Sequence, residues 1–573
     1  MIEKREKVFS LFSTSRWLLG EHHTIILSLA SLVQIIFALL DIFLLTLVGP
    51  LITSAYGPTE SISSFSILGK SSISTREIIA LIVLTVLLKN IAGLVVQKFV
   101  INSLATRQAE VGTALVQASF FGGRDNRQPL HSTNLLQTIT SVIGTLFGTL
   151  FKPMIGLIGE IATLCAVVIG VLIINPQVAV FMIAYFSSFG YFIIRYIGSR
   201  QRSVGKISLD AEKQSLRAVS EIQIMSRELR LAHKDLDALI TLNNFRTMYA
   251  KNSSNSIFLS LVPRYSLEMI FLVGIGALVI FLGYFQQDQQ ILPVLALVVA
   301  AGYRILPSLN YIATNFGNFK SSISSLEHMD FMGNRFGIRL TDLNFNQSKN
   351  TNQKIRFSGD LHLKNVSYQY PVSKKTIFTD FNLIIKSGQT ILIEGLSGTG
   401  KSTLISLATG SLAPDRGCIF TVDGENEFAM DQNVTGISFL SQDVPLLDES
   451  FAYNIALEET FDKDVTRLKN AAAKAGILDR ILESPMGFNT QIGENGSLLS
   501  AGERQRLGIA RSLYSEPAFL ILDEPTANLD AVSEKLVWDT LVKLKGKFTI
   551  LIVSHRTVPE MVYDQVLKLP SST

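Results

Sequence analysis

A glycine-rich run that ends in a lysine occupies residues 395–402, where the sequence reads GLSGTGKS. It fits the pattern G-x-x-x-x-G-K-[ST], in which backbone N–H groups wrap an anion at the start of a helix. An apolar run at 390–393 precedes it and reads as a strand, and a helix is expected from Ser402. The alternative, a glycine-rich turn with a chance lysine, does not account for these flanks. We therefore expect a nucleoside triphosphate here, with Lys401 at its β- and γ-phosphates and Ser402 on Mg²⁺. The residues expected to hold the nucleotide at this loop are Gly395, Ser397, Gly398, Gly400, Lys401, Ser402 and Thr403.

Two acids end a second apolar run at 519–522. A carboxylate after a strand can hold the Mg²⁺ shell, and a second one can orient an attacking water. We assign Asp523 to the metal and Glu524 to the water. The alternative is a buried strand with a solvated acidic end.

The elements that must position these residues make up only half of the chain. The 573 residues are 47% hydrophobic and 17% charged, with a mean hydropathy of +0.33, which indicates a membrane protein. The net charge of +4 gives no reason to expect nucleic-acid binding. Cys165 and Cys418, far apart, offer neither a disulfide framework nor a zinc site. Residues 1–20 lack the pattern of a cleaved signal peptide.

Six apolar stretches in the first half are long enough to cross a bilayer, which takes about 20 residues. They run roughly over Ile25–Thr53, Ile78–Leu104, Thr140–Ile174, Val178–Ile197, Ile257–Phe285 and Ile291–Phe316. The long connections 108–131 and 198–256 are basic, as is the N-terminal segment, so the positive-inside bias places all three in the cytoplasm. Six crossings then return the chain to the cytoplasm, where the phosphate-binding loop needs to be.

These patterns predict four regions. We expect a cytoplasmic segment over 1–20, a six-helix transmembrane domain over 21–320, a polar linker over 321–361 and a nucleotide-binding domain over 362–573. The residues 55–74 after the first crossing read as an external loop or a short interfacial helix.

The second half resembles the nucleotide-binding domain of ATP-binding cassette (ABC) transporters. Its LSGGQ signature reads here as LSAGE, which keeps Ser500 and Gly502 but changes two other positions. The resemblance implies that Tyr370 stacks on adenine, that Gln442 senses Mg²⁺, that Asp530 lies in the D-loop and that His555 is the switch histidine. For Tyr370 and His555 the alternative is a structural residue at a strand end. Ser402, Gln442 and Asp523 are then the expected metal ligands, and Glu524, His555 and Lys401 the catalytic residues.

Taken whole, the chain resembles a half-size exporter-type ABC transporter. This implies a membrane α-helical bundle, six transmembrane helices with long cytoplasmic extensions, followed by an α/β P-loop domain. It also implies a homodimer in which the P-loop of one copy faces Ser500 of the other, although a heterodimer stays open. We place the coupling segments near Phe121–Arg127 and Ala232–Thr241, and we expect the last helices of the domain to be missing, because the sequence ends soon after 566–569.

Ionisable residues inside spanning segments are costly and mark functional sites. Lys89, Arg264 and Arg304 are expected to line a positive cavity for an anionic cargo, since Arg in particular suits phosphate. The alternative is internal pairing, for example of Asp41 with Lys89 or of Glu268 with Arg264. The segments 262–268 and 303–310 resemble helices of bacterial lipid-linked oligosaccharide flippases, whose cavity cations engage a pyrophosphate, although Lys89 stands where that group has arginine.

We therefore predict an ATP-driven flippase in the cytoplasmic (inner) membrane, multi-pass, with its cassette on the cytoplasmic side. The cargo implied by the resemblance is a lipid-linked oligosaccharide or a related polyprenyl-pyrophosphate glycan. The alternatives are an exporter of another lipid, a drug or a peptide, and an ATP-gated channel or regulator on the same fold. The presence of both Glu524 and His555 argues against the last.

Overall fold

The computed structural model describes residues 2–56, 75–121, 132–174, 176–285, 291–336, 355–370, 376–396, 398–430, 434–458, 465–527, 529–556 and 558–569. The chain divides into two compact units. We call them the helical unit, which holds 1–122 and 128–348, and the sheet unit, which holds 123–127 and 349–573. The predicted site residue Ser397, most of the external loop, most of the coupling segment Phe121–Arg127 and the residues after 569 lie outside the described residues.

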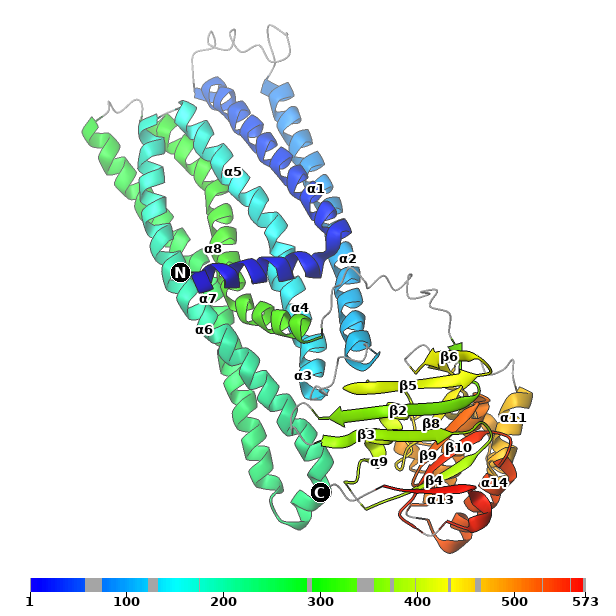
Figure 1. The fold of residues 1–573 in the computed structure, drawn as a ribbon. Coiled ribbons are helices and arrows are strands. Elements are labelled where there is room, and N and C mark those ends of the chain that lie inside the picture. Colours follow the sequence, from blue (N-terminus) through cyan, green and yellow to red (C-terminus); the bar gives the residue numbers. More distant parts are fainter. Residues whose placement is uncertain are drawn as a thin grey trace. The chain divides into compact units, whose positions relative to one another are not determined.

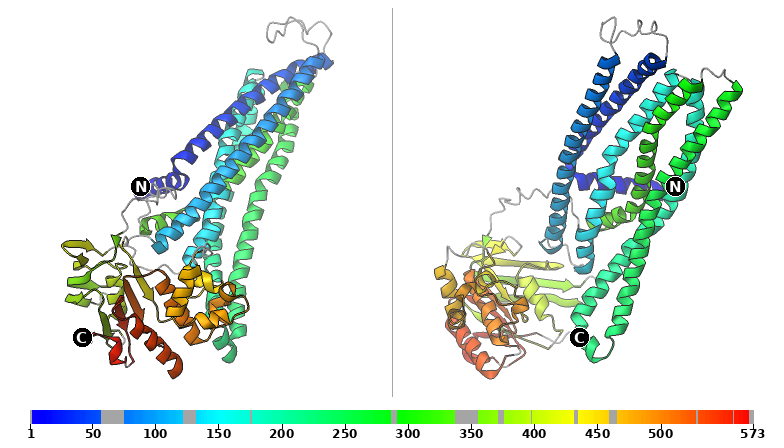
Figure 2. Two further views of the ribbon diagram at one scale, coloured as in Figure 1. Left: turned by 90° about the vertical axis from the view of Figure 1, so that its right-hand side faces the viewer. Right: turned by 180° about the vertical axis from the view of Figure 1, so that it is seen from behind.

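The helical unit is a bundle of long rods (Figures 1 and 2). Five helices in its described residues are long and apolar enough to cross a membrane. The sixth predicted crossing, Ile291–Phe316, lies on a helix whose first turns fall largely outside the described side chains. The helices are α1 (Ile2–Tyr56), α2 (Thr75–Phe121), α3 (Ser132–Gln137), α4 (Ile143–Thr145), α5 (Lys152–Ile174), α6 (Pro176–Leu231), α7 (Asp235–Phe285) and α8 (Ile291–Phe336), with π-helical turns at Thr138–Val142 and Leu146–Phe151 between α3 and α5.

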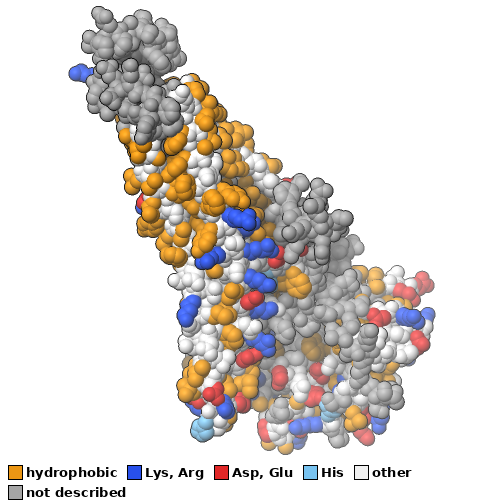
Figure 3. Space-filling model, turned by 90° about the vertical axis from the view of Figure 1, so that its left-hand side faces the viewer, with side chains coloured by type: hydrophobic (Ala, Val, Ile, Leu, Met, Phe, Trp, Pro, Cys, Tyr) orange, Lys and Arg blue, Asp and Glu red, His pale blue; other side chains and the backbone are white. Residues whose placement is uncertain are grey.

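The basic stretch 198–256 is helical over nearly all of its length. The rods α6 and α7 continue through it and meet at a tight turn, where His233 has a φ of 54°. Lys234 closes the turn by pairing with Asp237 at 3.0 Å. Figure 3 shows the change of surface along these rods, from hydrophobic side chains at the upper part to Lys, Arg, Asp and Glu at the lower part. The helices therefore extend well beyond their apolar windows.

The first helix bends at Gly20, which has a φ of 72° that only glycine adopts at little cost. Its N-terminal part lies across the other helices (Figures 1 and 2). The Arg107 guanidinium on α2 donates to the carbonyl oxygen of Leu18 at 2.9 Å, just before the bend. Thr14 donates to Asp330 on α8 at 2.7 Å. The predicted end of the N-terminal segment at residue 20 coincides with this bend.

The predicted linker 321–361 needs correction at both ends. Helix α8 continues to Phe336, and strands begin at Ile355 and Asp360. The first part of the predicted linker, up to Phe336, is helical and packs in the helical unit, since Ser322 and Ser325 are buried. Residues 337–354 lie outside the described residues. Small polar side chains in this first part bond to the neighbouring segment of the bundle, as Ser322 does with Thr149 at 2.7 Å.

The sheet unit is built around a parallel five-stranded sheet in the order β11-β4-β10-β9-β8. An antiparallel sheet in the order β3-β2-β5-β6 and a small parallel pair, β1 with β7, accompany it. The strands are β1 (Ile355–Arg356), β2 (Asp360–Gln369), β3 (Thr376–Ile385), β4 (Thr390–Glu394), β5 (Arg416–Asp423), β6 (Asn426–Ala429), β7 (Val434–Thr435), β8 (Ile437–Leu440), β9 (Phe519–Asp523), β10 (Thr549–Val553) and β11 (Gln565–Lys568). The helices are α9 (Lys401–Ala408), α10 (Phe451–Ala456), α11 (Val465–Lys474), α12 (Leu478–Leu482), α13 (Ala501–Tyr514) and α14 (Ala531–Leu544).

Alternate residues of the parallel strands enter two different cores. Leu520 and Leu522 of β9 pack with α10 to α14, whereas Phe519 and Ile521 pack with α9 and the antiparallel sheet. A parallel sheet covered on both faces needs continuous apolar strands, which explains why 519–522 has no polar residue. The strands β4 and β9 lie on either side of β10, so their carboxyl ends meet at one edge of the sheet. Ligands bind at this edge in open α/β sheets.

Candidate ATP site and membrane cluster

The loop after β4 takes the form that its sequence predicts. Gly398 and Gly400 have φ values of 82° and 96°, and a Cβ added at Gly400 would lie 2.4 Å from Ile377. The Nζ of Lys401 donates to the carbonyl oxygens of Gly395 at 2.7 Å and of Leu396 at 3.0 Å. The lysine thus closes the loop on itself from the first position of α9. Ser402 and Thr403 follow it in the same helical turn.

Burial lowers the pKa of Lys401, whereas the charges of Glu524 and Asp523 raise it. The lysine and the two acids therefore share one electrostatic environment. The pKa of Asp523, which ends β9, is raised by burial and by Glu524, while Lys401 and His555 act in the opposite direction. A cation in this environment would favour the ionised form of Asp523.

The Glu524 carboxylate is held from both sides. Its Oε2 accepts a hydrogen bond from Gln442 Nε2 at 2.9 Å, and its Oε1 lies 3.1 Å from His555 Nε2. The backbone of Glu524 is in the left-handed region, with a φ of 46°, and its N–H donates to the Val553 carbonyl at 2.8 Å. Three residues that are far apart in the sequence are therefore brought together beyond the ends of β8, β9 and β10.

Tyr370 lies beside the start of α9, directly after β2. Its hydroxyl is 3.1 Å from Thr403 Oγ1, and its ring meets Tyr368 edge-to-face at 5.3 Å. Tyr368 is buried, whereas Tyr370 is partly exposed. An aromatic ring that is anchored at its edge and open on one side can stack on a base.

Ser500, Gly502 and Asp530 form a second group. Ser500 is the N-cap of α13, and Asp530 caps α14 by accepting from the N–H groups of Val532 at 3.1 Å and Ser533 at 3.2 Å. A Cβ at Gly502 would lie 2.7 Å from Ser533 Oγ, so glycine is needed where α13 approaches the start of α14. In the described residues, Ser500 bonds to groups in the first turn of α13, and Asp530 bonds to groups in the first turn of α14.

Position 503 carries glutamate where the LSGGQ signature has glutamine, and the carboxylate of Glu503 has a partner that the motif does not indicate. Glu503 completes a capping box with Ser500 and also accepts from Arg480 Nε at 2.8 Å. No spacing rule points to Arg480, which lies on α12. The sole signal in the sequence was the carboxylate at a position where the resembled family has a neutral amide.

In the helical unit, two of the three predicted cavity cations share one acid. Asp41 on α1 is buried and pairs through its two oxygens with Lys89 on α2 and Arg304 on α8. Ser308, one turn after Arg304, donates to Glu160 on α5 at 2.5 Å. We call Asp41, Lys89, Glu160, Arg304 and Ser308 the membrane cluster.

The third cation has different surroundings. Arg264 Nε lies 3.3 Å from Glu268, and its guanidinium is 5.9 Å from the centre of the Tyr265 ring. Its side chain is 62% exposed, against 37% for Arg304. The internal pairing considered as the alternative, Asp41 with Lys89 and Glu268 with Arg264, is present. The formal charges of the membrane cluster cancel within one chain, so the described contacts do not make it strongly positive.

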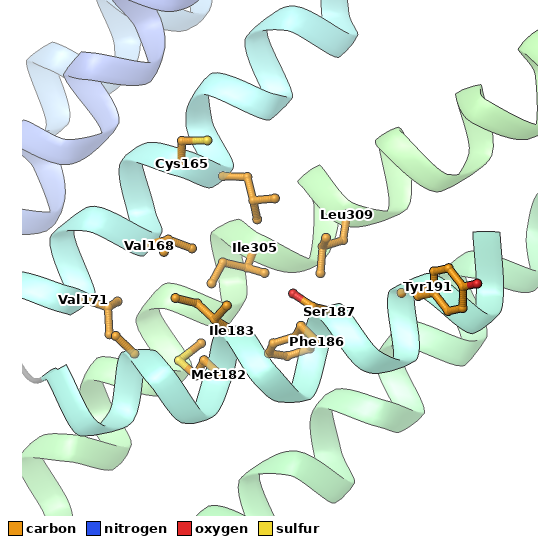
Figure 4. A pocket seen from close by; sticks show the side chains of 13 residues that line it. Cys165, Val168, Val171, Met182, Ile183, Phe186, Ser187, Tyr191, Ile305 and Leu309 are labelled. Carbon is orange, nitrogen blue, oxygen red and sulfur yellow. The ribbon is translucent and has the colours of Figure 1, made fainter. Parts of the chain in front are cut away.

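An apolar cavity of about 510 Å³ lies between α5, α6 and α8. Figure 4 shows side chains from these helices pointing into it, with Tyr191 towards one end. Ile305 and Leu309 line it from α8, and each directly follows a residue of the membrane cluster, Arg304 and Ser308. One helix therefore presents an apolar pair, Ile305 and Leu309, beside a polar pair, Arg304 and Ser308.

Comparisons with known proteins agree with the two units. Residues 378–527 match the model of the ABC transporter family. The chain is 40% identical over 203 residues to the ATP-dependent lipid A-core flippase of Alkalilimnicola ehrlichii, and 37% identical over 218 residues to that of Salmonella typhimurium. These alignments cover 35% and 37% of this chain, and 34% and 37% of the relatives.

A longer alignment, at 32% identity over 291 residues, covers 51% of this chain and 47% of the flippase of Pseudomonas aeruginosa. The chain thus spans between about a third and a half of the length of these curated relatives. A bacterial Atm1-family ABC exporter with ATP bound has a similar structure, with a TM-score of 0.69, 18% identity, and coverage of 96% of this chain and 93% of that one.

The predicted fold class is confirmed by the structural similarity over both units. The sheet unit carries the part that matches the family model, and we refer to it as the cassette. The chain is a multi-pass membrane protein with the fold of ABC exporters, in which a bundle of long helices precedes an ATP-binding cassette.

Proposed function

We propose that this protein hydrolyses ATP to drive export through the membrane, and that its cargo is an anionic glycolipid. The observation that carries the ATPase is the Glu524 carboxylate, held by Gln442 and His555 in the same environment as Lys401. A carboxylate fixed in this way can orient an attacking water and accept its proton. The arrangement favours an active ATPase over an ATP-gated channel or regulator, which can dispense with turnover.

The residues present also suit Mg²⁺, which takes oxygen ligands and few protein groups. Ser402, Asp523 and the Gln442 amide oxygen would hold it, because Gln442 already uses its Nε2 towards Glu524. Bound Mg²⁺ would neutralise charge on the phosphates. Lys401 would exchange the Gly395 and Leu396 carbonyls for phosphate oxygens, and Tyr370 would stack on the base.

We infer that two copies share each ATP. The start of α13, with its N-cap Ser500, is the kind of helix N-terminus that attracts a phosphate. Its described contacts are with α12 and α14, and not with Lys401 or Glu524. A second copy would bring this helix start to the phosphate held by the first, with the cassettes on the cytoplasmic side of the inner membrane.

The proposal of a lipid cargo is supported by the apolar cavity, whose lining residue Ile305 directly follows Arg304 on α8. A lipid tail fits the apolar lining, and phosphate oxygens can replace Asp41 as partners of Arg304 and Lys89. A polyprenyl-pyrophosphate glycan has both features. A lipid of the lipid A-core type also has them, and the names of the relatives favour this second candidate.

Reconstitution into liposomes with a panel of lipids tests the cargo. A polyprenyl-pyrophosphate glycan or a lipid A-core glycolipid should stimulate ATPase and cross the bilayer, whereas zwitterionic phospholipid should do neither. Stimulation by neither glycolipid would contradict the proposed cargo class. Stimulation by only one of them would choose between the two candidates.

Arg304→Ala should lower lipid transport and lipid-stimulated ATPase about tenfold, because a charged partner of the lipid phosphate is lost. Basal ATPase should fall less than either of these two activities. Asp41 keeps Lys89 as a partner in this variant, so no buried carboxylate is left alone. The matched control is Arg217→Ala, which removes an exposed arginine paired with Glu221 on the extension of α6. Transport that is equal in the Arg304→Ala and control proteins would contradict a role for the membrane cluster.

A further inference from the structure

The signature helix α13 carries an ionised acid in its first turn. Both oxygens of the Glu503 carboxylate are occupied: Oε2 accepts from the Ser500 N–H at 2.8 Å, and Oε1 accepts from Arg480 Nε at 2.8 Å. Its side chain is 18% exposed. Burial acts to raise the pKa of Glu503, but the hydrogen bonds from Ser500 and the charge of Arg480 outweigh it and lower the pKa. The acid is therefore negatively charged at neutral pH.

Arg480 is itself fixed in place. Its Nη1 donates to Ser484 Oγ at 2.9 Å, and that hydroxyl donates to the Arg480 carbonyl at 3.0 Å. Ser484 is buried. A guanidinium held by a serine on its own segment loses little further freedom when it pairs with Glu503.

The negative charge of Glu503 lies at a helix N-terminus, where a phosphate would bind, and Arg480 neutralises this charge. A helix N-terminus stabilises an anion through its free N–H groups and its dipole. A bare carboxylate in the same turn repels a phosphate that approaches from outside, and the capping role of this side chain is equally served by glutamine. Neutralising the carboxylate keeps the cap and removes the repulsion.

We propose that Arg480 is a positioning residue of the shared ATP site, which neutralises Glu503 so that the start of α13 accepts the terminal phosphate of ATP bound to a second copy of this chain. The proposal rests on the proposed function, in which two copies share each ATP. Under this proposal, the ion pair of Arg480 and Glu503 has no net charge and takes the place of the neutral residue that the LSGGQ signature has at this position.

The test compares steady-state ATPase of the purified full-length chain with the variants Arg480→Ala, Glu503→Gln and the double variant. Arg480→Ala should raise the KM for ATP about tenfold, because an uncompensated carboxylate then faces the phosphate. Glu503→Gln should stay near the wild type, since glutamine keeps the capping box. The double variant should return KM to within about threefold of the wild type, although it lacks the ion pair.

A merely structural ion pair predicts a different pattern. Each single variant would then lose activity, and the double variant would be no better than Arg480→Ala; this result would overturn the proposal. The matched control is Lys545→Ala, which breaks the pair with Asp564 at 2.8 Å elsewhere in the cassette and should leave KM unchanged. Thermal melting of every variant separates loss of folding from loss of affinity, and rescue by the second substitution excludes misfolding.

Two failures are distinguishable. A wild-type chain without ATP turnover would overturn the proposed function, and this inference with it. An active wild type together with an unchanged KM in Arg480→Ala would overturn this inference alone and leave the proposed ATPase in place.

Discussion

At the scale of single residues, the candidate ATP site depends on a few strained or enclosed positions. Glu524 has a positive φ, which a residue other than glycine adopts at some cost. The strain turns the chain directly after β9 and directs the carboxylate towards Gln442 and His555. The preceding residue, Asp523, stays in regular strand geometry and pairs in register with Val553 of β10. Two adjacent acids thus have different surroundings, which suits two different roles.

We expect Glu524→Gln to bind ATP but to lose turnover by about 10²–10⁴-fold, the usual contribution of a positioned general base. Glutamine has the same shape and can still bond to Gln442 and His555. Phosphate release measures turnover, and a fluorescent ATP analogue measures binding. Hydrolysis that stays within tenfold of the wild type would remove Glu524 from the catalytic role.

At the scale of elements, the cassette is held together where strands begin as well as where they end. Asp564, just before β11, accepts from the Thr390 N–H at the start of β4 at 2.9 Å. Its other oxygen pairs with Lys545, which follows α14, at 2.8 Å. One carboxylate therefore connects two neighbouring parallel strands and a helix, on the edge of the sheet opposite to the ATP site.

Burial acts to raise the pKa of Asp564, but the hydrogen bonds from Lys545 and Thr390 outweigh it and lower the pKa. A group with a lowered folded pKa stabilises the fold above its unfolded pKa, about 3.9 for aspartate, and loses this contribution as the pH falls through the folded pKa. The stabilisation by ionised Asp564 should therefore appear in the pH dependence of the melting temperature of the cassette.

In Asp564→Asn, the cassette transition should melt about 2–4 °C below the wild type at pH 7, the shift that a loss of about 1 kcal/mol causes in a domain of this size. The difference in melting temperature between Asp564→Asn and the wild type should become smaller below pH 4. Scanning calorimetry of the cassette transition across pH measures both effects. Asp539→Asn is the charge-matched control, because Asp539 is exposed on α14. A gap that is constant with pH would contradict the stated role of the Asp564 charge.

At the scale of the molecule, one chain combines helices that suit a membrane with a cassette that suits ATP. The helices continue out of their apolar windows, as α6 and α7 do up to the turn at 232–234. The predicted coupling segment Ala232–Thr241 includes this turn and the start of α7, and its role stays a prediction. The ATP-site residues fall into two groups, one around Lys401 and one around Ser500, which a second copy would bring together.

A mixing experiment tests this sharing. Lys401→Ala and Ser500→Arg should each abolish ATPase when present alone. Co-expressed with separate tags, they should recover up to about half of wild-type activity in the doubly tagged fraction, because every dimer in that fraction is mixed and has one intact site out of two. Recovery is measured on doubly tagged, purified protein. If both groups act within one copy, the mixed protein stays as inactive as its parents.

Much of the ATP site was accessible from short patterns. Each of three patterns follows a buried strand: the glycine-rich loop after β4, the acids after β9 and the histidine after β10. Since parallel strands end at a common edge, these groups lie together there, and their roles stay predictions. The membrane bundle followed from apolar length alone. The loop glycines needed no tertiary information, since a positive φ at Gly398 and Gly400 is a local requirement.

The partners of these residues depended on the tertiary structure. Pairing of Arg304 with Asp41, and of Arg480 with Glu503, joins side chains from different helices, and no spacing along the chain encodes such a contact. The linker was misplaced for the same reason, because Ser322 is buried only once α8 packs on its neighbours. The order of residues along the chain is enough to show which groups are present and which strand ends carry them. The tertiary structure decided which charges are neutralised, because neutralisation depends on distance and burial, which only packing sets.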